Sequence, residues 1–180
     1  KNVQPLGFGA NHNKALLKSD ADFFIITNPD IRIKTISLEG FVSHFLQKNT
    51  GIVGPAILNP DGKPEDSTRE FPNFYSLFSK LIGFQDTFNL PQSVSLVDWI
   101  AGMFMIIPKE VFKKVGGFDS KRFFMYYEDV DLCLRVKNLG YEIIYDPTQS
   151  VTHDAQRASR HNLRHMKWHI TSMFRFLSGI

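Results

Sequence analysis

Hydrophobic positions along this chain follow two spacings in turn, and this alternation predicts strands and helices in alternation. Short apolar runs of strand length are each stopped by turn-forming residues, as at residues 22–27 and 51–55. Further strands are expected at residues 94–98, 102–107 and 142–145. Between these runs, apolar residues recur at every third or fourth position, which is typical of helices with one buried face. Strands that alternate with helices favour an α/β sandwich built on a largely parallel sheet.

The helical segments have recognisable ends. Helices are expected over residues 7–17, 37–48, 108–115 and 128–139, and from about residue 159 onward. Pro108 suits a first helical turn, and Gly140 is a typical helix stop. The polar segment 59–72 is rich in turn formers, and loops of this length in compact domains are often functional.

Composition restricts the partners only mildly. The chain has 180 residues, enough for one domain with a real core, and carries a formal charge of +3 with a pI near 9.0. This charge permits a sugar nucleotide, a lipid diphosphate or an acidic membrane surface, and we expect no nucleic acid. Cys133 is the only cysteine, which excludes an intrachain disulfide and favours a reducing compartment. No apolar run has transmembrane length and no signal peptide is visible, so we expect a cytoplasmic protein.

The most informative segment is an acidic cluster that directly follows aromatic residues and precedes a helical pattern. Glu128, Asp129 and Asp131 place three carboxylates in four positions. Neighbouring carboxylates raise one another's pKa unless a cation or hydrogen-bond donors compensate, so the cluster needs a reason. One reason is chemistry. The other is helix capping, with Asp129 as the N-cap and the helix dipole favouring the charges.

Two further candidates follow predicted strands. Asp30 ends the Asn28-Pro29-Asp30 turn after a buried strand, where open α/β sheets bind ligands at their carboxyl edge. An ordinary turn is the alternative for Asp30. His153 follows a strand-like segment, and a structural histidine is the common alternative there. A carboxylate and an imidazole together suit Mn²⁺.

Arg69 and Trp99 have the chemistry of substrate contacts. Arg69 lies at the end of the long polar loop, where it could pair with a substrate anion, although a solvated surface arginine is the default. Trp99 precedes Gly102 closely and offers a ring for the apolar face of a sugar, with a core tryptophan as the alternative.

Taken in order, these motifs resemble the inverting GT-A glycosyltransferases of family 2, in particular the rhamnosyltransferase-like branch. The matching residues are Asn2 with 7–13, 27–30, Gly54-Pro55, Asp61-Gly62, 69–72, 98–102, 116–119, 124–135 and His153. The resemblance covers essentially the whole chain and implies a three-layer GT-A sandwich. It also implies that the first βα units, which grip the nucleotide, should precede Asn2. We therefore expect an N-terminally truncated fragment that does not turn over by itself.

The resemblance implies roles for the candidate residues. Asp30 matches the last position of the metal-binding acidic motif, and His153 matches a later metal-contacting histidine. The implied cofactor is Mn²⁺ or Mg²⁺, and we expect the two side chains roughly 4–6 Å apart with the ion between them. Asp129 matches the catalytic base, with Glu128 beside it as a contact to the acceptor. The residues assigned to substrate binding are Arg69, Trp99, Gly102 and Asp131, the last with a helix-start or packing role as the alternative.

The predicted function is transfer of a sugar, with rhamnose expected, from a nucleotide-diphospho-sugar to a cell-surface glycan or lipid-linked acceptor with inversion. Two alternatives stay open. One is a sugar-nucleotide nucleotidyltransferase, which also uses an α/β sheet and metal-binding acids. The other is a non-catalytic module that docks to a glycan or a membrane.

The C-terminal segment predicts a second structural unit. Residues 1–155 would form the catalytic portion, and residues 156–180 a basic amphipathic helix for the inner face of an anionic membrane. The basic residues are Arg157, Arg160, Arg164 and Lys167, and the apolar stripe is Leu163, Met166, Ile170, Met173, Phe174 and Leu177. The alternative is a stripe that packs on the body of the domain or on a second subunit.

Overall fold

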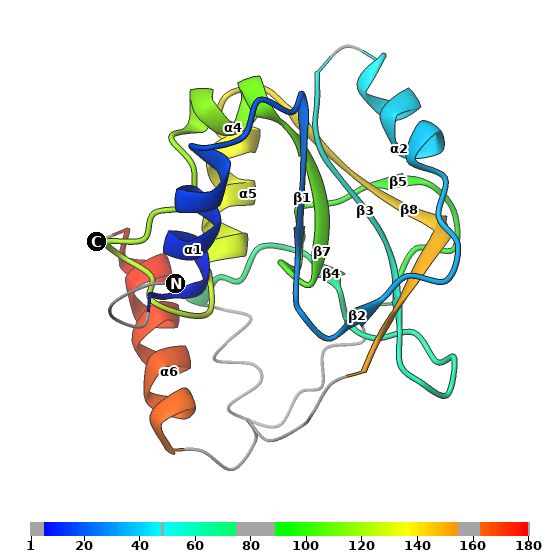
Figure 1. The fold of residues 1–180 in the computed structure, drawn as a ribbon. Coiled ribbons are helices and arrows are strands. Elements are labelled where there is room, and N and C mark those ends of the chain that lie inside the picture. Colours follow the sequence, from blue (N-terminus) through cyan, green and yellow to red (C-terminus); the bar gives the residue numbers. More distant parts are fainter. Residues whose placement is uncertain (1–5, 48, 75–88, 155–162, 180) are drawn as a thin grey trace.

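A mixed β-sheet covered by helices on both faces forms the centre of the molecule (Figure 1). The computed structural model describes residues 6–47, 49–74, 89–154 and 163–179. The elements in chain order are α1 (Phe8–Leu16), β1 (Phe23–Thr27), β2 (Ile31–Arg32), α2 (Leu38–Phe45), β3 (Thr50–Leu58), β4 (Thr68–Arg69), β5 (Ser95–Leu96), β6 (Trp99–Ile100), β7 (Phe104–Pro108), α4 (Lys109–Val115), α5 (Glu128–Asn138), β8 (Glu142–His153) and α6 (Leu163–Ser178). The large sheet has the order β1-β7-β3-β8-β2, with β5 also paired to β8, and β4 pairs with β6 separately.

Strands of this sheet run mostly antiparallel, so the expectation of a largely parallel sheet was wrong. Among the pairings of the described strands, only β3 with β8 is parallel. A parallel pair needs a long crossover, and here the chain from β3 to β8 contains α4 and α5. β7 lies between β1 and β3 and runs opposite to both. Alternation of strands and helices along the sequence therefore did not determine the strand directions.

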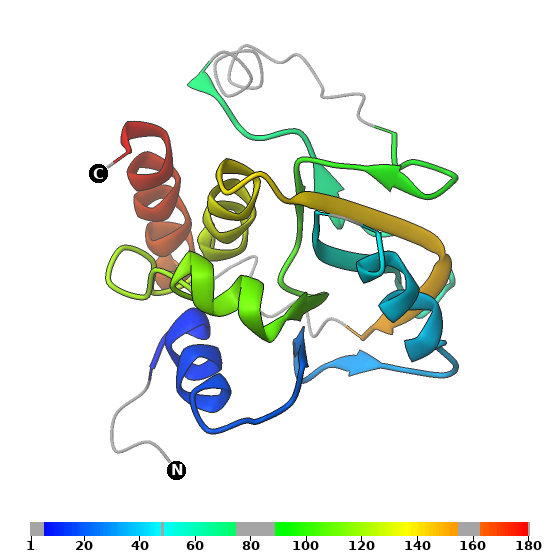
Figure 2. The same cartoon turned by 90° about the horizontal axis from the view of Figure 1, so that it is seen from above.

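The core has two halves, one on each face of the sheet. Along β7, Met105 and Ile107 belong to the cluster that also contains residues of α4 and α5. Phe104 and Ile106 belong to the other cluster, together with Phe41 of α2. Figure 2 shows α1, α4 and α5 on one side of the sheet and α2 on the other. The alternation along one strand that is buried on both faces confirms the three-layer sandwich.

β8 is longer than expected because the strand continues through a shift in its pairing register with β3. Pro55 pairs with Asp146 and Ala56 pairs with Ser150, so the pairing register shifts between them. The turn-like residues 147–149 lie in this shift, and the strand continues beyond it to His153. His153 is thereby placed at the end of a strand, as the sequence predicted.

α6 packs on the segment that precedes the acidic cluster. Ser172 donates a hydrogen bond to the Met125 carbonyl at 2.9 Å, and the Tyr126 hydroxyl lies 2.9 Å from Nδ1 of His165. The Phe124 and Trp168 rings also lie in contact. The apolar residues Leu163, Met166, Ile170 and Phe174 stay exposed, at 77, 55, 44 and 59 %. Met173 and Leu177 are half-buried, and Arg157 and Arg160 lie outside the described residues. The exposed stripe is therefore narrower than the expected one.

Candidate active site

A strained turn directly precedes the acidic cluster, which lies at the start of α5. Tyr126 and Tyr127 have φ angles of 70° and 65°, in the left-handed region that glycine normally occupies. Each such residue costs about 1–3 kcal/mol, and strain of this kind concentrates at functional sites. The N-cap of α5 is Tyr127, which makes no side-chain capping bond. Asp129 is therefore not the N-cap, and that capping role does not explain it.

Gly102 fixes the carboxylate of Asp129. The Gly102 N–H donates to Oδ2 at 2.8 Å, and the Val130 N–H donates to Oδ1 at 2.9 Å. A Cβ atom at position 102 would lie 3.1 Å from the ring of Phe8, tighter than an ordinary contact. Glycine thus permits the close approach that places this N–H on the carboxylate.

Glu128 and Asp129 differ in how well their charged forms are stabilised. Burial raises the pKa of Glu128 to about 8, with the neighbouring Asp129 charge adding to the shift. Burial also raises the pKa of Asp129, while its backbone hydrogen bonds oppose that shift. Glu128 is 6 % exposed, and its Oε2 atom has no hydrogen-bond partner in the structure. The two groups compete for the charge, and Asp129 is the member whose charged form accepts hydrogen bonds from the Gly102 and Val130 N–H groups.

The change Glu128→Gln should raise the melting temperature at pH 8 and alter it little at pH 5. The pKa of Glu128 is about 8 in the folded state, against an ordinary value of 4.5. Between these pH values the unfolded state releases the proton and the folded state keeps it, so the free energy of unfolding decreases as the pH rises. Glutamine has no proton to release, so the loss at high pH disappears. Thermal unfolding followed by circular dichroism at both pH values measures this. An equal shift at pH 5 and pH 8 would contradict it.

The structure sets Asp131 apart from the other two carboxylates. It is buried and pairs with Arg135 at 2.7 Å and with Arg122 at 3.3 Å. Arg135 also donates to the carbonyls of Val115 and Gly117, at the end of α4. Asp131 therefore joins α5 to α4 through its arginine, which corresponds to the packing alternative rather than to a substrate contact.

The predicted metal pair converges at the ends of β1 and β8. His153 Nε2 lies 3.4 Å from Asp30 Oδ1. The expected gap of 4–6 Å was too wide, because two ligands at right angles around one ion, each about 2.1–2.3 Å from it, lie only about 3 Å apart. Oδ1 of Asp30 is buried and has no hydrogen-bond partner among the residues that the structure describes. An orphaned carboxylate oxygen beside an imidazole nitrogen fits a divalent cation.

Sequence reasoning missed the partner of this histidine. Nδ1 of His153 lies 2.7 Å from the carboxylate of Glu65, which belongs to the polar loop expected to be functional. Within the part of the chain that the structure describes, no group of three or more His, Cys, Asp or Glu side chains could hold a metal ion by itself. Asp30 and His153 would thus need further ligands from a bound substrate or water.

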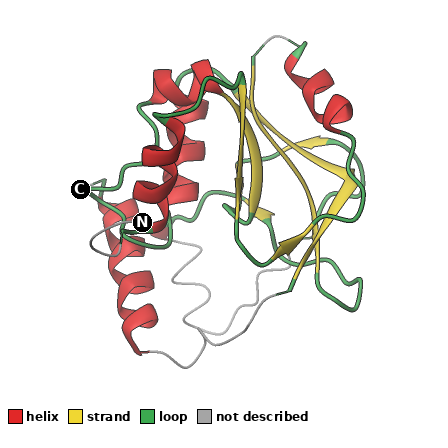
Figure 3. Cartoon of the chain, in the orientation of Figure 1, coloured by secondary structure: helices red, strands yellow, loops and turns green. Residues whose placement is uncertain are grey.

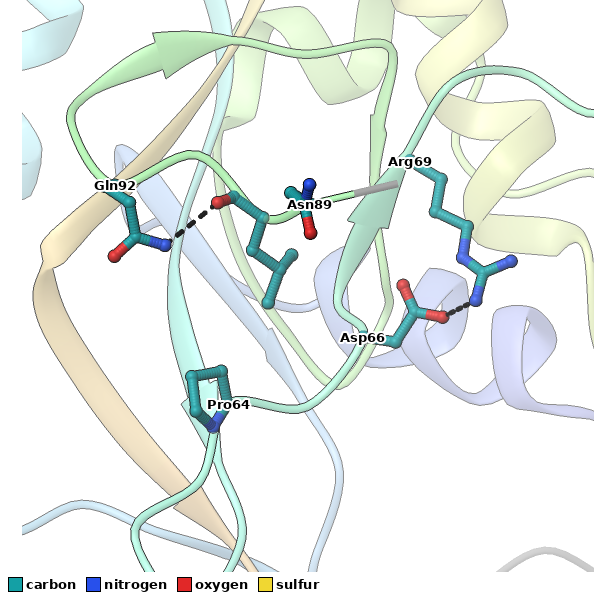
Figure 4. A pocket seen from close by; sticks show the side chains of 6 residues that line it. Pro64, Asp66, Arg69, Asn89 and Gln92 are labelled. Atoms are coloured by element: carbon teal, nitrogen blue, oxygen red, sulfur yellow. Dashed lines mark hydrogen bonds and ion pairs between the residues drawn. The ribbon is translucent and has the colours of Figure 1, made fainter. Parts of the chain in front are cut away.

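Arg69 and Trp99 lie directly opposite each other. They pair across the small sheet formed by β4 and β6, and the Trp99 indole N–H donates to the Glu70 carbonyl at 3.1 Å. Arg69 is ion-paired with Asp66, toward which its guanidinium points in Figure 4. A pocket of about 370 Å³ is lined by Pro64, Asp66, Arg69, Asn89, Leu90 and Gln92. Trp99 is half-buried against the core, so part of its ring serves packing.

Backbone contacts bring the acidic pair and the metal pair to the same edge of the sheet. The carbonyl of Met103, next to Gly102, accepts hydrogen bonds from the Asn28 N–H at 3.1 Å and the Thr27 hydroxyl at 3.3 Å. The end of β1, which leads to Asp30, therefore lies beside the loop whose Gly102 N–H binds Asp129. Figure 3 shows the green loop that leaves the lower end of β1. Ala101, in that same loop, donates to the Ser67 carbonyl at 2.8 Å, near Arg69.

Several sequence relatives of the chain are glycosyltransferases by name. Rhamnosyltransferase WbbL of Escherichia coli is 31% identical over 186 residues, which cover 96% of this chain and 70% of the relative. N-acetylglucosaminyl-diphospho-decaprenol L-rhamnosyltransferase of Mycobacterium tuberculosis is 28% identical, and the chain spans 64% of its length. The low-salt glycan biosynthesis hexosyltransferase Agl10 of Haloferax volcanii is 28% identical over 76% of this chain and 45% of its own. No family model matches the chain.

Solved structures establish the fold. GalNAc-T7 in complex with UDP, GalNAc and Mn²⁺ superposes with a TM-score of 0.65 at 13% identity, over 86% of this chain and 31% of its own. The mannosyltransferase PcManGT of Pyrobaculum calidifontis, in complex with GDP-Man and Mn²⁺, has a TM-score of 0.60 at 17% identity, over 97% of this chain and 45% of its own. Both are glycosyltransferases, and the shared architecture is the GT-A sandwich.

Proposed function

Because the chain belongs to the rhamnosyltransferase-like glycosyltransferases of family 2, we propose that it carries the catalytic part of an inverting, metal-dependent transferase. The observation that carries the proposal is the Asp129 carboxylate, held by the Gly102 N–H beside a protonated Glu128. A carboxylate that two backbone N–H groups hold in place at the edge of the sheet is positioned to take a proton, as a general base does.

In the proposed reaction, Asp129 takes the proton from an acceptor hydroxyl. As that O–H bond breaks, the acceptor oxygen bonds to the anomeric carbon of the donor, and the bond from that carbon to the diphosphate breaks on the opposite face. A single displacement inverts the anomeric configuration and needs one base, by the same geometric logic that applies to inverting glycosidases. Glu128, which is neutral, can donate a hydrogen bond to the acceptor.

The proposed metal ligands are Asp30 and His153. These two side chains would hold Mn²⁺ or Mg²⁺, and such an ion would supply positive charge for the leaving diphosphate. The 3.4 Å approach of the two side chains and the orphaned oxygen of Asp30 support this assignment.

The proposed substrates follow from the relatives' names. A relative from Mycobacterium tuberculosis is an L-rhamnosyltransferase named for a decaprenol-linked diphosphosugar. We assign a nucleotide-diphospho-rhamnose donor and a lipid-linked or cell-surface glycan acceptor to this protein. Arg69 would bind a substrate anion in exchange for Asp66, and the open part of the Trp99 ring would contact a sugar. No contact of these residues favours the two alternative functions, a sugar-nucleotide nucleotidyltransferase or a non-catalytic docking module.

A donor panel tests the proposed function. The full-length protein is incubated with dTDP-, UDP- and GDP-sugars and Mn²⁺ or Mg²⁺, and release of the nucleoside diphosphate is measured with and without acceptor lipids. We expect dTDP- or UDP-rhamnose to be preferred and the metal to be required. Release of inorganic pyrophosphate from a nucleoside triphosphate and a sugar phosphate would instead identify a nucleotidyltransferase.

The exposed face of α6 is proposed to meet an anionic membrane. No helix among the described residues is long and apolar enough to cross a bilayer. The stripe Leu163, Met166, Ile170 and Phe174 is exposed beside Arg164 and Lys167, while the opposite side of α6 packs on the domain. Apolar side chains flanked by cations suit an acidic lipid surface, which would bring the site to a lipid-linked acceptor.

Changing Arg164 and Lys167 to Glu should abolish binding to vesicles that contain anionic lipid. Each basic residue near such a surface contributes about 1 kcal/mol, so reversing two charges lowers the affinity more than tenfold. Co-sedimentation at low and high salt measures this, with Lys34→Glu and Lys63→Glu, two exposed lysines elsewhere, as the matched control. A well-folded protein that binds no vesicles at low salt, or that dimerises through the stripe, would exclude the membrane role.

A further inference from the structure

We propose that Glu65 is a positioning residue that orients His153 for the cation. The inference rests on the proposed function, since it concerns the same metal pair. Glu65 Oε2 lies 2.7 Å from Nδ1 of His153, and Nε2 of the same ring lies 3.4 Å from Asp30 Oδ1. The imidazole therefore lies between two carboxylates, with the Glu65 contact at Nδ1 shorter than the Asp30 contact at Nε2.

The shorter contact is a hydrogen bond, and it determines which nitrogen carries the proton. An ionised carboxylate can only accept, so in the neutral ring Nδ1–H donates to Glu65 and Nε2 keeps its lone pair on the side of Asp30. A ring that is held in this way presents a ready ligand, and carboxylate-histidine-metal arrangements of this kind raise the basicity of the ligand nitrogen. In the other tautomer, Nε2–H would donate to Asp30 Oδ1. His153 Nε2 and Asp30 Oδ1 would then bond to each other, and neither atom could bind a metal ion.

The backbone around the three side chains is well anchored. The Glu65 N–H donates to the Ile57 carbonyl of β3 at 2.7 Å, which returns the polar loop onto the sheet. His153 pairs with Ile31 across β8 and β2, and the Asp154 N–H donates to the Asp30 carbonyl at 3.0 Å. The side chains of His153 and Glu65 are only 12 % and 22 % exposed. Neither partner is free to turn away, so this hydrogen bond can hold the ring.

Three elements distant in the sequence thus meet at one histidine. Glu65 precedes His153 by 88 positions in the sequence. Glu65 contacts Nδ1, whereas Asp30 lies beside Nε2 of the same ring, so Glu65 is not placed beside the nitrogen that faces Asp30. Its role is to fix the ring rather than to bind the ion.

The test compares Glu65→Gln and Glu65→Ala with Asp61→Asn, which removes an equal charge from an exposed position in the same loop. Two quantities are measured on the full-length protein. The tautomer of His153 comes from the ¹⁵N shifts of the imidazole in the metal-free protein, at a pH where the ring is neutral. The affinity for Mn²⁺ comes from the electron paramagnetic resonance signal of the free ion, measured without and with UDP, whose diphosphate can supply the further ligands, and with UDP-only solutions as the blank.

We expect the proton on Nδ1 in the parent and in Asp61→Asn, and a tautomer mixture in Glu65→Ala. The affinity for Mn²⁺ should fall roughly 10–100-fold in Glu65→Ala and less in Glu65→Gln, whose amide oxygen still accepts the bond and which has nearly the same shape. A proton on Nε2 in the parent, or unchanged affinity in Glu65→Ala, would overturn the role of Glu65.

Two further variants distinguish an incorrect role for Glu65 from an incorrect assignment of the metal site. If Asp30→Asn and His153→Ala lower the affinity for Mn²⁺ but Glu65→Ala does not, the metal pair stands and the positioning role falls. If neither ligand variant changes Mn²⁺ binding, or the parent binds none, the metal pair itself is wrong and the inference falls with it. The donor panel judges the transferase activity independently of both.

Discussion

Replacing Asp129 with Asn should lower sugar transfer by the full-length protein roughly 10²–10⁴-fold, with donor affinity little changed. Asparagine keeps the shape of the side chain, and its carbonyl oxygen can still accept the Gly102 hydrogen bond that the parent forms at 2.8 Å. The amide cannot take a proton from the acceptor hydroxyl. The loss should therefore appear in kcat, while KM for the donor stays near the parent value.

Steady-state transfer with a fixed acceptor lipid measures this effect, and Asp61→Asn, at an exposed position, is the control for loss of one carboxylate. The melting temperature of Asp129→Asn should stay near that of the parent, because the change removes a buried charge, whose cost raises the pKa of Asp129, but also removes the acceptor of the Val130 N–H. Transfer within a few-fold of the parent would remove Asp129 from the role of base.

Replacing Asp131 with Ala should destabilise the protein by about 3 kcal/mol, because two arginines lose a buried partner. Arg135 lies 2.7 Å and Arg122 lies 3.3 Å from its carboxylate oxygens. Both arginines keep some exposure to solvent, which places the expected cost at the lower end of the range for buried pairs. For a chain of this size, we expect the melting temperature to fall by roughly 6–12 °C.

Thermal unfolding by calorimetry measures the effect on Asp131→Ala. Glu110→Ala is the matched control, because it removes a carboxylate from an exposed helical ion pair with Lys113. Such pairs contribute about 0.5 kcal/mol or less, so the control should unfold close to the parent. If Asp131→Ala keeps the parent's melting temperature and instead loses donor or acceptor binding, Asp131 is a substrate contact after all.

The strained turn before the acidic pair depends on α6. Contacts with that helix offset the strain energy of Tyr126 and Tyr127, whose φ angles are left-handed. The Tyr126 hydroxyl lies within hydrogen-bond distance of His165, and the Ser172 hydroxyl donates to the Met125 carbonyl. The ring of Tyr127 lies against His169 and Phe176. The helix that we propose for the membrane surface thus also supports the backbone that presents Asp129.

Local pattern alone was sufficient for several features. Apolar runs predicted β1, β3 and β7, and β3 and β7 are buried on both faces, which requires apolar side chains at nearly every position. Gly140 and the acidic cluster marked the two ends of α5. The order of the motifs identified the family. These features depend on neighbouring residues, and the sequence contains that information directly.

Only the tertiary structure decided the rest. Strand directions, the Glu65 contact to His153 and the Gly102 contact to Asp129 join residues far apart in the chain, and no local pattern specifies them. The same holds for the different roles of Asp129 and Asp131. Two positions apart on a helix, they point to different sides, and the neighbours on each side are a backbone N–H in one case and two arginines in the other. The sequence determined which groups this protein possesses, whereas packing determined which of them face each other, because the pKa and the contacts of a carboxylate depend on what the fold brings beside it.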